Sequence, residues 1–160
     1  MNIPNETSEA IPAGFVELPF GKGEHFLSLT GPLWGKRDDN KLVLGFRVTQ
    51  RLCNIGGICH GGMLMTFADM QLGLGARFDT EEEFGFMPTV SLTADFLAPA
   101  PLGAWVEGRT DLFRSTRNFV FVQCIVTSNG APAVRASGIM KSGGAPTNVK
   151  GLPNLRTLLK

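Results

Sequence analysis

The sequence contains little that would attract a macromolecular partner. It has no tyrosine and two histidines, and 15 Lys plus Arg balance 14 Asp plus Glu, for a net charge of +1. Such a balance gives no overall field for binding nucleic acid or an anionic membrane, and we expect neither partner. No run approaches the ~18 apolar residues of a membrane helix, and the first ten residues lack the basic and apolar regions of a signal peptide. We therefore expect a cytoplasmic protein with a small or apolar partner.

Cysteine is also scarce. Cys53, Cys59 and Cys124 are odd in number and follow no zinc or redox spacing, which is typical of free thiols in a reducing compartment. A metal site of Cys53, Cys59 and His60 is the alternative, but a fourth ligand is missing and the neighbours are apolar. We therefore expect no metal and interpret the cysteines as packing residues.

The 160 residues fit a single domain, for which we expect a core at about 42–141. Residues 42–49 alternate between apolar and polar side chains, as a half-buried strand does, and an apolar stretch at 63–78 is long enough for a helix of about four turns. Further strands are expected at 89–97, 105–113, 119–127 and 132–141, with hairpin turns at 36–41, 114–118 and 128–130. The order predicts an α+β domain whose antiparallel sheet wraps around a long central helix. Residues 1–19 are expected to form a tail or a surface segment.

The helix is preceded by a glycine-rich connection. No Ser, Thr or Asp occupies a good N-cap position, so the amides of Gly61, Gly62 and Met63 are expected to point outward. A free helix N-terminus can hold a phosphate, a carboxylate or the oxyanion of a carbonyl under attack. A simple glycine turn is the alternative interpretation.

Asp69 lies two turns inside the predicted helix, beside Phe67, Ala68 and Met70. A carboxylate there is neither a cap nor an ordinary surface charge, which favours work on a proton or an electrophile. A hydrogen-bonded core aspartate, or a polar stripe with Thr66, is the alternative.

The spacing between the two features constrains the geometry of the site. Nine residues at ~1.5 Å per residue separate His60 from Asp69 by ~13 Å along one helix. The helix start and Asp69 can therefore act on one carbon only if different copies of the chain supply them, as in an isologous dimer.

These residues resemble a known family. Asn54, the run His60-Gly61-Gly62, Asp69 and then PTVSLTADFLAPAPLG are similar to the hotdog-fold thioesterases of the phenylacetyl-CoA thioesterase type, over about residues 42–141. The resemblance implies a hotdog homodimer, often paired into a dimer of dimers. It also implies hydrolysis of acyl-CoA thioesters without metal or bound cofactor.

The resemblance assigns roles residue by residue. Asp69 matches the catalytic carboxylate, as general base or nucleophile, and Gly61 matches the residue whose amide polarises the thioester carbonyl. Asn54 and His60 match residues that orient the loop and the thioester, with Gly62 also at the substrate. Thr89 falls where relatives place a Ser or Thr that positions water across the site from Asp69, although an ordinary strand residue is the alternative.

The chain departs from the family pattern at one hairpin, where relatives often carry Gly beside a basic residue and this chain has Arg114-Ser115-Thr116-Arg117. Arg114 and Arg117 are candidates for the CoA phosphates, because arginine suits phosphate. Solvated turn arginines are the alternative. Candidates for an acyl pocket are Phe84, Phe86, Met87 and Met63.

Two competing functions remain. A hotdog hydratase or dehydratase would also bind acyl thioesters, but such enzymes resemble one another in a carboxylate shortly before a Pro-Leu-His segment, which this sequence lacks. A non-catalytic acyl-CoA-binding module is the other, and the presence of both Asp69 and the glycine run argues against it.

Overall fold

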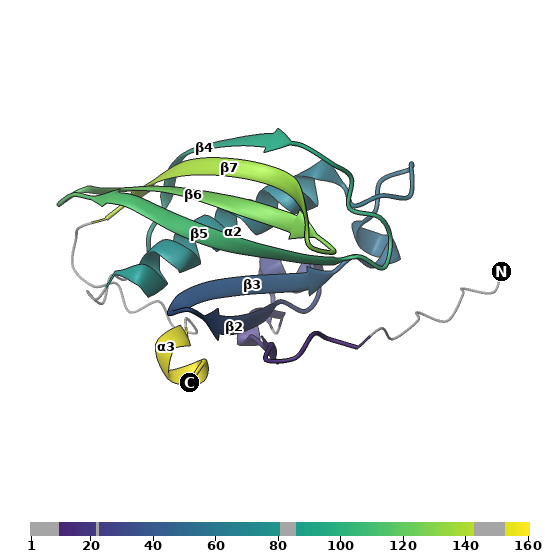
Figure 1. Ribbon diagram of the computed structural model, residues 1–160, viewed down its shortest axis with the longest axis horizontal. Coiled ribbons are helices and arrows are strands. Elements are labelled where there is room, and N and C mark those ends of the chain that lie inside the picture. The colour runs from purple at the N-terminus through teal and green to yellow at the C-terminus, as the bar shows by residue number, and fades with distance from the viewer. Residues whose placement is uncertain (1–9, 22, 81–85, 143–152) are drawn as a thin grey trace.

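A computed structural model describes residues 10–21, 23–80, 86–142 and 153–160, which contain one long helix and one antiparallel sheet of seven strands (Figure 1). The strands are β1 (Val16–Glu17), β2 (Trp34–Asp38), β3 (Lys41–Arg47), β4 (Thr89–Phe96), β5 (Trp105–Ser115), β6 (Phe119–Ser128) and β7 (Ala131–Lys141). The helices are α1 (Phe26–Leu29), α2 (Gly61–Asp79) and α3 (Leu155–Leu158), with 3-10 turns η1 (Pro19–Gly21) and η2 (Gln50–Leu52). The predicted α+β architecture is confirmed.

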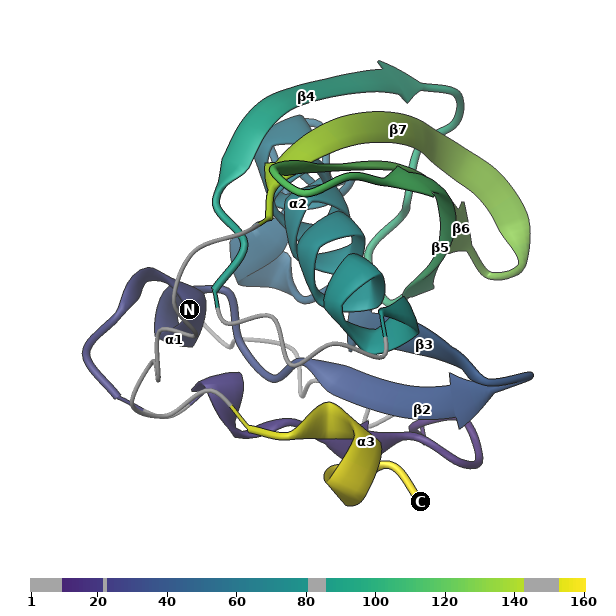
Figure 2. The ribbon, with the colours of Figure 1, turned by 90° about the vertical axis from the view of Figure 1, so that its left-hand side faces the viewer.

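The sheet curls around α2, which lies inside the curve (Figure 2). Its strand order is β1-β2-β3-β5-β6-β7-β4, and every neighbouring pair is antiparallel. The strand that follows the helix, β4, pairs only with β7 and forms one edge of the sheet. Within the described residues, the other edge of β4 is not paired with a strand.

The main core fills the space between α2 and the concave face of the sheet. Alternate residues of β6 and β7 are buried, as expected for strands with one covered face. Phe67 of α2 is fully buried and its ring lies 4.9 Å from that of Phe46 in β3, between centroids. Burial of these apolar surfaces fixes α2 against the sheet.

Two predicted hairpin turns are shorter than the sequence suggested. Residues 36–38 belong to β2, and the turn is made by Asp39 and Asn40, which adopt positive φ angles of 47° and 61°. Arg114 and Ser115 belong to β5. Pairing with a neighbouring strand keeps these polar residues extended, in spite of their turn-like composition.

A second apolar cluster covers the face of the sheet opposite α2. Phe15 packs edge-on against Trp105, with ring centroids 4.9 Å apart, and Val43 completes the buried group. Arg47 donates hydrogen bonds to the carbonyls of Ala10 (2.8 Å) and Gly103 (3.0 Å). The N-terminal segment from residue 10 therefore lies across the surface, in agreement with one of the two predicted alternatives; residues 1–9 lie outside the described ranges.

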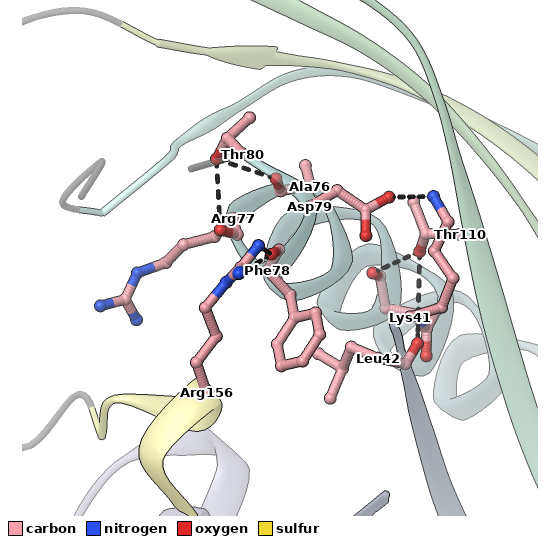
Figure 3. Close-up of polar contacts among 10 residues, drawn as sticks. Lys41, Leu42, Ala76, Arg77, Phe78, Asp79, Thr80, Thr110 and Arg156 are labelled. Atoms are coloured by element: carbon pink, nitrogen blue, oxygen red, sulfur yellow. Dashed lines mark hydrogen bonds and ion pairs between the residues drawn. The ribbon is translucent and has the colours of Figure 1, made fainter. Parts of the chain in front are cut away.

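The C-terminal segment, which the sequence left unassigned, contacts the last turn of α2 (Figure 3). Leu155 and Leu159 are buried in the main core. The guanidinium of Arg156 donates to the Phe78 carbonyl and lies over the Phe78 ring. A cation at this position satisfies terminal carbonyls and suits the negative end of the helix dipole.

A buried polar network joins the middle of α2 to the sheet. The side chain of Gln71, fully buried, accepts a hydrogen bond from Leu44 N (3.0 Å) and donates to Leu42 O (3.1 Å) and Thr110 Oγ1 (2.9 Å). The Thr110 hydroxyl donates to the Gln71 carbonyl at 2.7 Å. One amide thus joins the helix to both β3 and β5.

No helix within the described ranges combines the length and apolarity needed to cross a bilayer.

Candidate functional site

The glycine loop before α2 is organised by Asn54. Its Oδ1 accepts hydrogen bonds from the amides of Gly56 (2.8 Å) and, more weakly, Ile58 (3.5 Å). The backbone N–H of Asn54 also donates to the Ile58 carbonyl at 2.8 Å. An asparagine that bonds to the backbone two residues onward forms an Asx turn. Asn54 therefore shapes the loop that leads into the helix.

His60 is the N-cap of α2. Its backbone is extended (φ −63°, ψ 135°), and its Nδ1 accepts a hydrogen bond from Gly62 N at 2.9 Å. Met63 N donates to the His60 carbonyl at 2.9 Å. The expectation of three outward amides is wrong for Gly62, where an imidazole nitrogen takes the part of the usual Ser, Thr or Asp oxygen, and for Met63, whose amide is bonded to the His60 carbonyl. In the described part of the chain, the Gly61 amide has no acceptor.

Asp69 and Thr89 meet between α2 and the start of β4. The Thr89 hydroxyl donates a hydrogen bond to Asp69 Oδ1 at 2.6 Å. Asp69 is half-buried and Thr89 is exposed. A short hydroxyl-to-carboxylate bond is among the stronger hydrogen bonds of proteins and fixes the carboxylate rotamer.

The helix start lies at the other end of β4. A methyl group at Gly61 would lie 3.6 Å from the ring of Phe96, the last residue of β4. Gly61 and Asp69 are eight residues apart on α2, or ~12 Å along its axis. Within one chain, the amide and the carboxylate thus lie at opposite ends of one edge strand. Neither composition nor spacing in the sequence predicts that Phe96 lies beside the start of the helix.

Arg114 and Arg117 are exposed. Arg114 follows a register shift in β5, and Arg117 lies in the turn between β5 and β6. Neither side chain makes an ion pair or hydrogen bond among the described residues. The structure does not bring them to Asp69, and they remain candidates for contact with a ligand.

The residues suggested for an acyl pocket are dispersed. Met87 is buried in the main core, Phe86 is 61% exposed, and Met63 packs at the margin of the core. Phe84 lies outside the described residues.

Burial dominates the chemistry of two cysteines. Desolvation raises the pKa of the Cys59 thiol to about 12, with a smaller contribution from nearby Cys53. Desolvation likewise raises the pKa of Cys124 to about 12, against a hydrogen bond from the Ala136 backbone. These thiols stay protonated at neutral pH, as packing residues do, and neither is suited to nucleophilic attack.

Comparison with known proteins identifies the family. The model of the thioesterase superfamily matches residues 56–132, a range that includes Gly61, Asp69 and Thr89. A Pseudomonas aeruginosa protein named "Putative esterase PA0474" is 33% identical over 130 residues, which are 81% of this chain and 95% of that protein. The chain belongs to the thioesterase superfamily.

Solved thioesterase structures share the fold. Zebrafish thioesterase superfamily member 2 matches with a TM-score of 0.70 and 18% identity, over 78% of this chain and 91% of its own. A hypothetical thioesterase of Streptococcus pneumoniae with coenzyme A gives a TM-score of 0.65 and 18% identity, covering 74% and 91%. A mutant of the phenylacetic acid degradation protein PaaI from Thermus thermophilus gives 0.60 and 23%, covering 68% and 91%. The predicted hotdog fold is confirmed.

Proposed function

We propose that this member of the thioesterase superfamily hydrolyses acyl-CoA thioesters to a free acid and CoA. The observation that carries the proposal is the half-buried Asp69 carboxylate, oriented by the Thr89 hydroxyl at 2.6 Å on a thioesterase fold. The presence of coenzyme A in the related S. pneumoniae structure supports CoA as the thiol.

The proposed chemistry needs one donor and one carboxylate. The Gly61 amide donates to the thioester oxygen and stabilises the negative charge that develops there. Asp69 then takes a proton from water, whose oxygen bonds to the carbonyl carbon as the C–S bond breaks and the thiolate leaves. Alternatively Asp69 attacks first, and water hydrolyses the resulting anhydride. Both routes consume one water, one proton of which passes to the leaving thiolate, and release an acid and a thiol.

We propose that two subunits share each site. Thr89, at the start of the edge strand β4, lies beside Asp69 of α2. Phe96, at the end of β4, lies beside Gly61 of α2. Antiparallel pairing of two β4 edges about a two-fold axis would place the start of one strand beside the end of the other. The Gly61 amide of one subunit would then approach Asp69 of its partner. A homodimer follows, and its further pairing into a tetramer stays a prediction.

The test is release of free thiol from a panel of acyl-CoAs. We expect turnover by the wild-type protein and near-complete loss of turnover in Asp69→Asn, because an amide cannot act as base or nucleophile. The variant should still fold, because the two side chains are nearly isosteric. Asp111→Asn, on an exposed position of β5, is the matched control and should keep full activity.

Three results would decide against the proposal. Full activity of Asp69→Asn would exclude Asp69 from the chemistry. Tight acyl-CoA binding without thiol release would indicate a binding module. Hydration of an enoyl-CoA with the thioester intact would indicate a hydratase.

A further inference from the structure

Two cysteines face each other at the base of the glycine loop before α2. Cys53 and Cys59 form an isolated antiparallel β-bridge. One backbone hydrogen bond of 2.8 Å lies on each side of this bridge: from Asn54 N to Ile58 O and from His60 N to Leu52 O. In an antiparallel pair flanked in this way, the two facing residues do not bond to each other's backbone, and their side chains lie closer than in the alternative pairing. The fold thus brings together two thiols that the sequence spacing does not link.

The backbone of the bridge has the dimensions that a disulfide requires. Facing Cα atoms of such a pair lie ~4.5 Å apart, within the ~4.4–6.8 Å that disulfides span. Both cysteine amides point away from the bridge, Cys53 N to the Gln50 carbonyl (3.1 Å) and Cys59 N to the Ala100 carbonyl (2.8 Å). The charge of Cys53 contributes to the raised pKa of Cys59, as expected for neighbouring sulfurs. A bond between the two free thiols would therefore need rotation of side chains and little movement of the backbone.

Each thiol makes one weak contact that this rotation would break. Cys53 Sγ lies 3.5 Å from the Thr49 carbonyl, and Cys59 Sγ lies 3.9 Å from the His60 carbonyl. A thiol is a weak hydrogen-bond donor, so these contacts oppose the rotation only slightly. The two cysteines differ in access, because Cys53 is half-buried and Cys59 is 3% exposed. A dissolved reagent would therefore meet Cys53 first.

We propose that Cys53 and Cys59 are a reversible redox pair, which low-molecular-weight disulfides convert into an intrachain disulfide at the base of the glycine loop. This modification does not depend on the proposed thioesterase chemistry. It would tie the C-terminal end of η2 to the residue before the N-cap His60. The segment that leads to Gly61 would then be held in place by a covalent bond in addition to its two backbone hydrogen bonds.

The exchange proceeds in two balanced steps. The Cys53 thiolate attacks one sulfur of the small disulfide; a mixed disulfide forms, the original S–S bond breaks, and the leaving thiolate takes up the proton that Cys53 lost. Cys59 then gives its proton to water and attacks the Cys53 sulfur, which releases the second small thiolate to take up a proton. In total two protein thiols lose two electrons, and one small disulfide becomes two thiols.

Burial affects the second step but does not prevent it. The raised pKa of Cys59, about 12, disfavours its attack on a dissolved reagent. A mixed disulfide on Cys53 would instead be fixed beside Cys59, and groups so placed react as if at very high concentration.

The test treats the reduced full-length protein with glutathione disulfide. Titratable thiols in denaturant should fall from three per chain to one and return to three with dithiothreitol. Trypsin should release residues 52–77 as one peptide that contains both cysteines of the pair and not Cys124, and mass spectrometry should find it lighter by two hydrogens. Hydrogen exchange at the Asn54 and His60 amides should be slower in the oxidised protein, since the link opposes local opening of the bridge.

Single variants separate the roles of the two thiols. Cys59→Ala should stop at the first step and carry one glutathione on Cys53. Cys53→Ala should stay unmodified, because Cys59 is buried. Cys124→Ala is the matched control and should form the disulfide as wild type does.

Several results would overturn the inference. Wild type that keeps all three thiols, or that stops at a mixed disulfide on Cys53, would exclude the pair. Cross-linking between chains on a non-reducing gel, without the lighter 52–77 peptide, would assign the disulfide to two molecules. Unchanged exchange at both amides after oxidation would contradict the hold on the loop.

Discussion

One hydrogen bond sets the orientation of the proposed catalytic carboxylate. Thr89 donates to Asp69 Oδ1, and no other bond to this carboxylate occurs among the described residues, so Oδ2 is open there to a water molecule or a substrate. Thr89→Val keeps the shape of the side chain and removes the donor. Because hydrogen bonds to charged groups contribute ~1.5–3 kcal/mol, we expect kcat to fall by about tenfold to a hundredfold with little change in KM.

Thr93→Val is the control for this substitution. Thr93 lies on the same strand, and its hydroxyl pairs with that of Ser137 at 2.8 Å. Wild-type kcat is expected for Thr93→Val in a steady-state thiol-release assay. The same result for Thr89→Val would show that the carboxylate needs no orienting donor.

Gly61 allows the amide itself to be tested. Proline lacks the N–H and is favoured at the first position of a helix, and the extended His60 backbone (φ −63°, ψ 135°) suits a residue before proline. Gly61→Pro should therefore fold with a Tm near that of wild type. Its kcat should fall by a factor of about 10²–10³, the typical effect of one lost oxyanion donor. Gly61→Ala retains the N–H, and its methyl group would make an ordinary contact with Phe96 at 3.6 Å. Equal activity of the two variants would contradict a role for the amide.

The sequence could predict part of this site. Asp69 stands out because a carboxylate inside an apolar helix is unusual, and the glycine run marks the helix start. The cap by His60 could not be predicted, because it depends on an imidazole nitrogen that accepts from Gly62 N. The Thr89–Asp69 bond joins a helix to a strand across twenty residues, and only the resemblance suggested that Thr89 matters.

At the scale of elements, length and period decide what can be predicted. The helix α2 and the strands β3 to β7 are long and periodic, and the sequence located them within a few residues. The short elements β1, α1 and α3 were missed, since their local patterns are weak, and β2 was implied only by the hairpin turn predicted before β3. Contacts formed only in the folded chain stabilise them, such as burial of Leu155 in the core beside α2.

Gln71 makes the attachment of α2 to the sheet testable. Gln71→Leu fills a similar volume but removes the side-chain partner of Leu44 N and of Leu42 O, while the Thr110 hydroxyl keeps its bond to the backbone carbonyl of residue 71. A buried polar group left unsatisfied costs ~1–3 kcal/mol, so we expect the free energy of unfolding to fall by at least ~2 kcal/mol in urea titrations. Gln123→Leu, on the partly exposed face of β6, should change it by less than about 0.5 kcal/mol. Similar midpoints for both variants would refute the role of the network.

For the whole molecule, the proposed sharing of sites predicts complementation. Asp69→Asn and Gly61→Pro homodimers each have two damaged sites. In a mixed dimer both lesions fall in one site and the other is intact. Random mixing makes about half of the dimers mixed, so co-refolded protein should recover roughly a quarter of wild-type activity under two-fold symmetry.

The control is mass spectrometry that confirms mixed dimers before the thiol-release assay. Activity no higher than that of the parents would mean that each site belongs to a single subunit.

The buried thiols predict how global stability changes at alkaline pH. Burial raises the pKa of Cys59 and of Cys124 from 9.0 to about 12. The unfolded chain then loses these protons at lower pH than the folded protein, so their contribution is complete below pH 9 and is lost as pH rises toward about 12. Urea unfolding of wild type and of the Cys59→Ala, Cys124→Ala double variant should show a steeper loss for wild type above pH 9. If the stability of both proteins fell in parallel with pH, the contribution of the buried thiols would be contradicted.

The position of β4 at the edge of the sheet has a consequence for solubility. Its eight residues, Thr89–Phe96, include neither lysine nor proline, which commonly protect exposed edges from pairing with other chains. Val90 and Phe96 are 56% and 54% exposed in the single subunit. A subunit outside the proposed dimer would offer this strand as a template for aggregation. For the proposed dimer, dilution of the protein would therefore carry a hazard of aggregation in addition to the loss of the shared sites.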